Sequence, residues 1–180
     1  MAGYVGIDES NHGRVPEIFV AVYSSNLSDI ERINELPKRR NKKEIGDILE
    51  ATDFKHIIIS QEYRNLMTDQ GMLLVAVSEL VNGFSEQNYS IDMVFVDGQV
   101  KERTLNEIRK NIKPACNRIL FEPNADKTFP VVNLADYIAN GLHRHYAHFK
   151  NVYDNKKYWD KLITPDIKRY REQLDLLNGR

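Results

Sequence analysis

Two adjacent carboxylic acids, Asp8 and Glu9, directly follow the mostly apolar residues that open the chain. The segment 3–8 has the composition of a buried strand, and a carboxylate at the end of such a strand is costly because burial removes its hydration. A divalent cation offsets that cost, since Mg²⁺ and Mn²⁺ prefer hard oxygen ligands. The pair therefore makes metal-dependent phosphate chemistry the leading hypothesis.

Further acids occur where they could complete such a site. Asp97 follows a second apolar run over 91–96, and the segment after the last predicted strand offers Glu122, Asp126 and Asp136. Converging carboxylates repel one another, and two divalent ions about 4 Å apart relieve this repulsion and can activate water for phosphodiester cleavage. The pattern predicts a metal-dependent nuclease or phosphodiesterase that uses Mg²⁺ or Mn²⁺.

Hydrophobic patterning predicts the elements that must position these acids. The expected strands are 3–8, 17–24, 54–60, 91–96 and 116–121, and the expected principal helices are 69–86, 104–113 and 131–149. A turn-prone loop makes the first two strands antiparallel, whereas the later strands follow helices. We therefore expect an α/β fold with a mixed five-stranded sheet flanked by helices. If the strands that end at Asp8 and Asp97 are parallel neighbours, these two carboxylates face each other.

The length of 180 residues predicts one domain spanning 1–180. Within it we expect a helical insertion at about 27–52 and C-terminal helices at about 155–177. Capping-box spacing at Ser28 and at Thr104 predicts that helices start at these two residues.

Charge and cysteine content limit the partners and the compartment. A net charge of −1 gives no overall attraction to nucleic acid, so a polyanion would need a local basic patch or metal ions. The single cysteine, Cys116, suits a reducing cytoplasm. The chain shows no signal-peptide pattern and no apolar run that could span a membrane, so we expect a cytoplasmic protein.

Three short motifs resemble those of ribonuclease HII, the type 2 ribonuclease H family. They are Gly6-Ile7-Asp8-Glu9, Val96-Asp97-Gly98 and the segment 124–132. The resemblance implies a ribonuclease H-like fold with metal-binding acids at Asp8, Glu9, Asp97 and Asp126. The Ala-Gly-Arg-Gly stretch that follows the acid pair in that family is replaced here by Ser-Asn-His-Gly-Arg at 10–14, and the Asp-Ser-Lys-Lys segment of the family is not matched. RNA, DNA and the hybrid thus all remain candidate substrates.

A second resemblance is to a widespread ribonuclease H-like family whose members open with Tyr-Ile-Asp-Glu-Ser-Gly. These proteins carry a Leu-Gln-x-Ala-Asp helix near the C-terminus, which resembles Leu-Ala-Asp at 134–136 here. This similarity implies that Asp136, rather than Asp126, is the closing carboxylate. The two alternatives stay open, with a slight preference for Asp136 because packing does not explain a charge inside an apolar helix.

Five residues are candidates for substrate binding. His12 follows the acid pair and could assist proton transfer to a leaving group, although a solvated histidine in a turn is the alternative. Phosphates could be held by the remaining four, Arg14, Lys38, Arg39 and Arg40. The rival hypothesis is a non-catalytic module that keeps the fold and binds nucleic acid or protein, which the near-neutral charge and the altered loop at 11–14 favour. The sequence does not indicate the oligomeric state.

Overall fold

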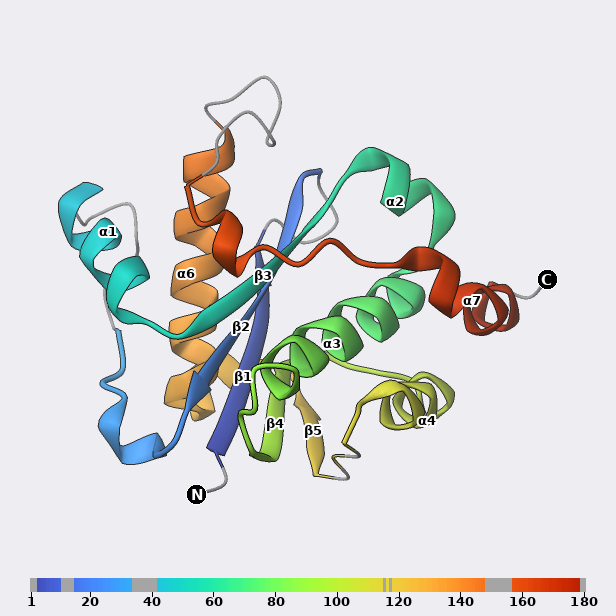
Figure 1. The fold of residues 1–180 in the computed structure, drawn as a ribbon, viewed down its shortest axis with the longest axis horizontal. Coiled ribbons are helices and arrows are strands. Elements are labelled where there is room, and N and C mark those ends of the chain that lie inside the picture. The colour runs from blue at the N-terminus through green and yellow to red at the C-terminus, as the bar shows by residue number, and fades with distance from the viewer. Residues whose placement is uncertain are drawn as a thin grey trace.

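A five-stranded mixed sheet forms the centre of the protein (Figure 1). The computed structural model describes residues 3–10, 15–33, 42–114, 116, 118–147 and 157–178. The strands are β1 (Gly3–Ser10), β2 (Glu17–Ser24), β3 (Phe54–Ile59), β4 (Ile91–Asp97) and β5 (Ile119–Glu122), in the spatial order β3-β2-β1-β4-β5. β2 is antiparallel to both β1 and β3, whereas β4 is parallel to both β1 and β5. The predicted α/β class and the mixed five-stranded sheet are confirmed.

Helices cover both faces of this sheet. The α-helices are α1 (Lys42–Ala51), α2 (Gln61–Leu66), α3 (Asp69–Ser85), α4 (Glu102–Asn111), α5 (Ala125–Thr128), α6 (Pro130–Ala147) and α7 (Arg171–Leu177). Short 3₁₀ helices lie at Leu27–Asp29 (η1), Trp159–Lys161 (η4) and Ile167–Tyr170 (η5). α3, α4 and α7 lie on one face of the sheet, and α6 and α1 lie on the other (Figure 1).

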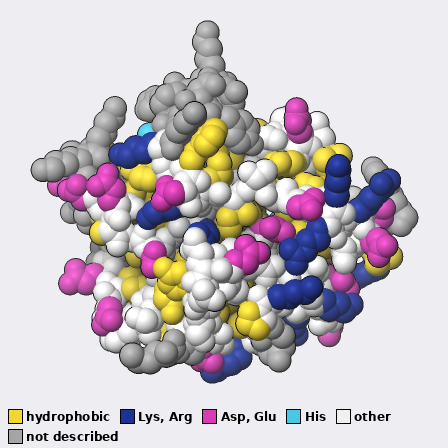
Figure 2. Space-filling model, viewed as in Figure 1, with side chains coloured by type: hydrophobic (Ala, Val, Ile, Leu, Met, Phe, Trp, Pro, Cys, Tyr) yellow, Lys and Arg dark blue, Asp and Glu magenta, His cyan; other side chains and the backbone are white. Residues whose placement is uncertain are grey.

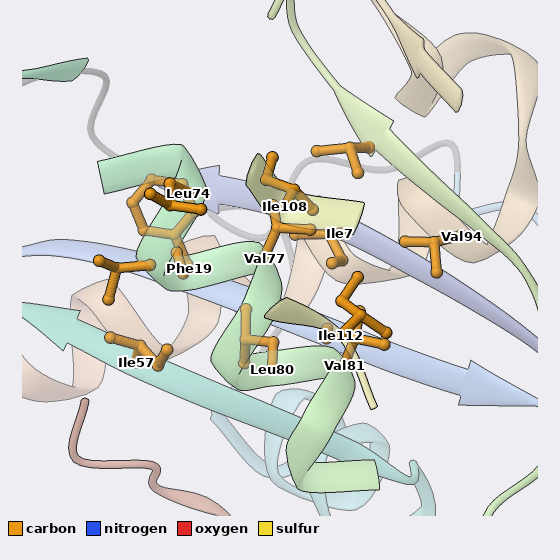
Figure 3. Packing of buried hydrophobic residues seen from close by; sticks show 14 of the residues in the cluster. Ile7, Phe19, Ile57, Leu74, Val77, Leu80, Val81, Val94, Ile108 and Ile112 are labelled. Atoms are coloured by element: carbon orange, nitrogen blue, oxygen red, sulfur yellow. The ribbon is translucent and has the colours of Figure 1, made fainter. Parts of the chain in front are cut away.

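The face that carries α3 holds an apolar core. Figure 3 shows side chains of β1, β2, β3 and β4 against those of α3 and against Ile108 and Ile112 at the end of α4. Leu74, Val77 and Leu80 on α3 are fully buried. A fully buried aliphatic side chain contributes about 1.5–3 kcal/mol to stability, so this layer holds the sheet together.

Two predicted helix starts are wrong. The short helix η1 is capped by Asn26, whose side chain accepts a hydrogen bond from the backbone N–H of Ser28. α4 begins at Glu102, and Thr104 is buried inside it instead of capping it. The start of α4 is held by a contact that the local pattern does not contain, since the side chain of Gln70 accepts a hydrogen bond of 2.9 Å from the Lys101 backbone N–H.

Candidate functional site

Asp8 and Asp97 lie side by side at the carboxyl ends of two neighbouring parallel strands. Ile7 on β1 pairs with Val96 on β4, so the next residue on each strand is an aspartate. Adjacent strands are about 4.8 Å apart, and side chains alternate between the two faces of a sheet. Because Ile7 and Val96 belong to the core under α3, Asp8 and Asp97 point to the face that carries α6.

A glycine lets α6 approach β1 closely. A Cβ atom on Gly6 would lie only 2.5 Å from the carbonyl carbon of Val131 in α6. The backbone N of the next residue, Val132, would lie 2.7 Å from the same Cβ atom, and from there four residues along the helix and two along the strand both span about 6 Å. α6 and β1 run in the same direction (Figure 1), so Asp136 on α6 comes to the level of Asp8 on β1.

The electrostatics of Asp8 reflect this convergence. The side chain is buried, and Asp8 is only 6% exposed. The pKa of Asp8 is raised from 3.8 to about 9, chiefly by burial and then by the carboxylates of Asp136, Asp97 and Glu9 in that order of importance, against a backbone hydrogen bond from Glu9 that lowers it. The carboxyl group of Asp8 therefore holds a proton at neutral pH unless a cation compensates its charge.

Hydrogen bonds fix the orientation of the other two aspartates. Asp97 Oδ1 accepts a bond of 2.6 Å from the backbone N–H of Ala125, and Asp136 Oδ1 accepts one of 2.7 Å from Asn140 Nδ2. Gly98 follows Asp97 with a φ of +105°, a backbone conformation that favours glycine. Sequence reasoning missed Asn140, although its spacing of four residues from Asp136 on a predicted helix could have indicated the pair. Ala125 donates to Asp97 through its backbone N–H, so no residue type in the sequence could have indicated this hydrogen bond.

The donor set suits a hard divalent cation. Its donors are carboxylate oxygens, joined by Ser10 Oγ on the same face of β1, which is buried and has no hydrogen-bond partner among the described residues. Among the residues that the structure describes, however, no three His, Cys, Asp or Glu side chains are close enough together to hold an ion. The residue types thus fit Mg²⁺ or Mn²⁺, while a closed cage is not preformed.

The remaining sequence candidates divide into two groups. Asp126 lies in the first turn of α5 and its backbone oxygen accepts a bond of 2.9 Å from Arg32 Nη2. It is not among the groups that raise the pKa of Asp8. Five further candidates lie outside the described residues, and the structure says nothing of them: His12, Arg14, Lys38, Arg39 and Arg40.

Glu9 faces the opposite side of the sheet from Asp8. Together with Asp97 it lines a pocket of about 360 Å³. Glu17, Arg64, Asp69 and Gln99 also line this pocket, beside apolar side chains from β2 and α3. Glu9 and Asp97 therefore border both the acidic cluster under α6 and this hollow on the α3 face.

Comparisons with solved structures identify the fold. The chain resembles RNase HII from Archaeoglobus fulgidus, solved as a complex with PCNA, with a TM-score of 0.63 and 18% identity over 99% of this chain and 90% of that one. It resembles ribonuclease H2 from Pyrococcus horikoshii OT3 with a TM-score of 0.60 and 17% identity, over 99% and 89%. Bst-RNase HIII in complex with Mn²⁺ gives a TM-score of 0.57 and 16% identity, over 81% of this chain and 56% of that one.

The protein thus has a ribonuclease H-like fold that resembles RNase HII, as the sequence motifs predicted. No protein-family model matches the sequence, and no curated protein matches it either. Within the described ranges, no helix has the length and apolar character needed to cross a membrane.

Proposed function

We propose that this protein is a metal-dependent nuclease that hydrolyses phosphodiester bonds of nucleic acid by a two-metal mechanism. The observation that carries this proposal is the buried Asp8, whose pKa is raised to about 9 by burial and by Asp136, Asp97 and Glu9. Several acids close to one buried carboxyl group destabilise the folded protein unless they bind a cation. Perturbed acids of this kind concentrate at functional sites.

The resemblance to solved ribonucleases supports the same proposal. The neighbours with this fold are described as RNase HII, ribonuclease H2 and RNase HIII, and one of them was solved with Mn²⁺. Since identity is only 16–18%, the similarity extends to the fold and leaves the chemistry to be argued from the acids themselves. The single free cysteine, Cys116, is buried and is compatible with the proposed cytoplasmic location.

Each acid has a proposed role. Asp8, Asp97 and Asp136 would hold the divalent ions, with Asp126 as the alternative to Asp136. Bound Mg²⁺ or Mn²⁺ would activate water and stabilise the leaving oxygen. Asp8 must lose its proton to serve as a ligand, and Glu9 would bind the second ion or orient a water molecule.

Cleavage assays on single aspartate variants test the proposal. Asp8→Asn and Asp97→Asn should each reduce Mn²⁺-dependent cleavage to background while the protein stays folded, because both remove a ligand charge without changing shape. Asp92→Asn is the matched control: Asp92 is the second residue of the strand that Asp97 ends, and it forms an exposed ion pair with Arg118. The proposal is wrong if the Asp8 and Asp97 variants cleave as well as the control.

The same assay separates the open alternatives. Comparing Asp136→Asn with Asp126→Asn identifies the closing carboxylate, and we expect the Asp136 variant to lose more activity. Single-stranded RNA, single-stranded DNA, duplex DNA and an RNA–DNA hybrid should be offered in parallel, with Mg²⁺ and with Mn²⁺. A protein that binds neither ion by calorimetry in the millimolar range would instead fit the non-catalytic module.

A further inference from the structure

The pocket on the α3 face adjoins the proposed metal centre through two shared acids, Glu9 and Asp97. Its volume of about 360 Å³ is within the range of small-ligand sites. Arg64 is the one cation among its lining side chains in the described part of the chain. Because the other charged residues that line the pocket are Glu9, Glu17, Asp69 and Asp97, an anion that enters it can form a favourable charged contact only with Arg64.

Arg64 is held firmly on one side and loosely on the other. Its Nη1 atom lies 2.8 Å from Oε2 of Glu17, whose side chain is only 4% exposed. Its Nη2 atom lies 3.3 Å from Oδ1 of Asp69, whose side chain is 82% exposed. An exposed pair of this kind contributes only about 0–1 kcal/mol, whereas breaking a buried pair costs several kcal/mol. Glu17 thus holds the guanidinium of Arg64 in place, whereas another anion could replace Asp69 as its second partner.

We propose that Arg64 binds a backbone phosphate of the nucleic acid, next to the phosphate that is cleaved, and that this phosphate displaces Asp69. The inference rests on the proposed nuclease function and names a substrate-binding residue for it. A guanidinium is planar and matches two phosphate oxygens, so an anchored Arg loses little freedom on binding. Glu17 has the role of holding the guanidinium at the pocket wall.

The surroundings of the pocket favour a polyanion over an isolated anion. A Cβ atom on Gly71, in the first turns of α3, would lie 2.8 Å from Leu174, so α7 packs beside the end of α3 that lines the pocket. Most of the Lys and Arg side chains visible in Figure 2 lie to the right, on the side of α4 and α7. Asp and Glu side chains lie among these cations in the same view, so a strand whose phosphate binds Arg64 could meet single Lys and Arg side chains on this side of a protein whose net charge is −1.

Binding of labelled oligonucleotides in EDTA tests this subsite apart from metal-dependent cleavage. The double variant Glu17→Gln/Arg64→Gln removes both charges of the buried pair together, so no unpaired charge stays buried. We expect about tenfold weaker binding, and a slope of log Kd against log salt that is smaller by about 0.7–0.9, the value of one phosphate contact. Thermal unfolding checks that the variant is folded.

Arg118→Gln is the matched control. Arg118 also pairs with an aspartate at 2.8 Å, but it lies at the opposite end of β4 from Asp97. We expect its Kd and salt slope to equal those of the wild type. If the double variant binds as tightly as Arg118→Gln and has the same slope, the subsite is refuted.

Asp69→Asn provides a test with the opposite sign. Removing the outer carboxylate frees Nη2 of Arg64, so oligonucleotide binding should tighten about two- to fivefold, the equivalent of an exposed ion pair. If the Arg64–Asp69 contact were only structural, this variant would not bind more tightly, and that result would overturn the inference. Displacement of the oligonucleotide by millimolar mononucleotide would also overturn it, because it would assign the site to small phosphates.

The outcomes for this subsite and for the proposed function can be told apart. Loss of cleavage in Asp8→Asn together with unchanged oligonucleotide binding in the Arg64 double variant would support the proposed nuclease and refute the phosphate subsite. Full cleavage in Asp8→Asn removes the proposed metal mechanism, whatever the Arg64 variants do.

Discussion

The two faces of the central sheet are built from the same strands but differ in what they bury. Under α3 the β1 side chains are Val5 and Ile7, which join a continuous apolar core. Under α6 the alternate positions on β1 are Gly6 and Asp8, the first of which admits a helix backbone and the second of which meets other acids. The α6 face has an apolar core of its own, but only on this face does β1 bury an acid that meets other acids, so the apolar contacts of the two faces must offset that repulsion.

This division depends on the period of two in a strand. A shift of β1 by one residue would exchange its two sets of side chains and bury Asp8 in the α3 core. The register of β1 with its neighbours is specified by both faces at once, since Ile7 must meet the core and Gly6 must meet α6. We expect the two faces to respond differently to mutation.

The largest expected effect comes from a cavity on the α3 face. Leu74 is fully buried in the core that Figure 3 shows, and Leu74→Ala should lower the free energy of unfolding by about 2–5 kcal/mol. Urea denaturation measures this loss. The remaining folded protein should still bind Mn²⁺ with an affinity within about twofold of the wild type, because Leu74 lies on the other side of the sheet. A large loss of Mn²⁺ affinity would show that the two faces are not separable.

Gly6→Ala should have the next largest effect, and it should change both the stability of the protein and the proposed metal site. The new Cβ atom would lie 2.5 Å from the backbone of Val131, so α6 must move away from β1. We expect a loss of about 1–3 kcal/mol in the free energy of unfolding, the usual cost of overpacking. Weaker Mn²⁺ binding should accompany it, because α6 carries Asp136.

Gly46→Ala is the matched control for this substitution. Gly46 lies inside α1, and a Cβ atom there would meet nothing within 4 Å. Alanine should instead raise stability by about 0.5–1 kcal/mol through helix propensity. Equal effects of the two substitutions would contradict the argument for a close approach at Gly6.

Much of the fold could be predicted because it follows local periodicity. Apolar runs gave all five strands, and the helical pattern of 69–86 corresponds to α3 at Asp69–Ser85. The ends of elements were harder, because tertiary contacts decide them. The predicted strand 116–121 is β5 at Ile119–Glu122, and the start of α4 is held by Gln70 from a different helix.

The candidate site could be predicted only as a list of acids. Parallel pairing of β1 and β4 explains why Asp8 and Asp97 lie side by side, and the expectation from sequence was conditional on that pairing. The level at which α6 meets β1 depends on the contact at Gly6, which no local pattern contains. The pocket with Arg64 was missed for the same reason, because the residues of its ion pair are 47 positions apart.

Asp8→Asn should stabilise the ion-free protein, opposite in sign to the changes at Leu74 and Gly6. The pKa of Asp8 is raised from 3.8 to about 9, so the unfolded state releases this proton before the folded state does. The free energy of unfolding therefore falls as the pH rises between these values. At pH 8 in EDTA the variant should be more stable than the wild type by at least about 1 kcal/mol, because pH 8 lies several pKa units above 3.8 and one unit is worth roughly this much.

Thermal unfolding across pH provides the control for this prediction. Well below pH 3.8 the advantage of Asp8→Asn should vanish, because both states of the wild type are then protonated at this residue. Saturating Mn²⁺ should reverse the order of stability at pH 8, since an ion that binds only the folded wild type stabilises it. An advantage that is constant across pH would mean that burial of charge at Asp8 does not limit stability.

The smallest expected effect concerns the orientation of one ligand on the α6 face. Asn140 Nδ2 donates to Asp136 Oδ1 at 2.7 Å and to the Asp136 backbone oxygen at 3.0 Å. Asn140→Ala should weaken Mn²⁺ binding by about tenfold, as is typical when a residue that orients a metal ligand is lost. Stability should change by less than about 1 kcal/mol, because the side chain is only half-buried.

Calorimetry with Mn²⁺ measures the affinity, and Asn140→Asp separates orientation from charge. The added carboxylate cannot donate to Asp136, so it restores tight binding only if charge alone, without a fixed geometry, determines the affinity of this face for cations.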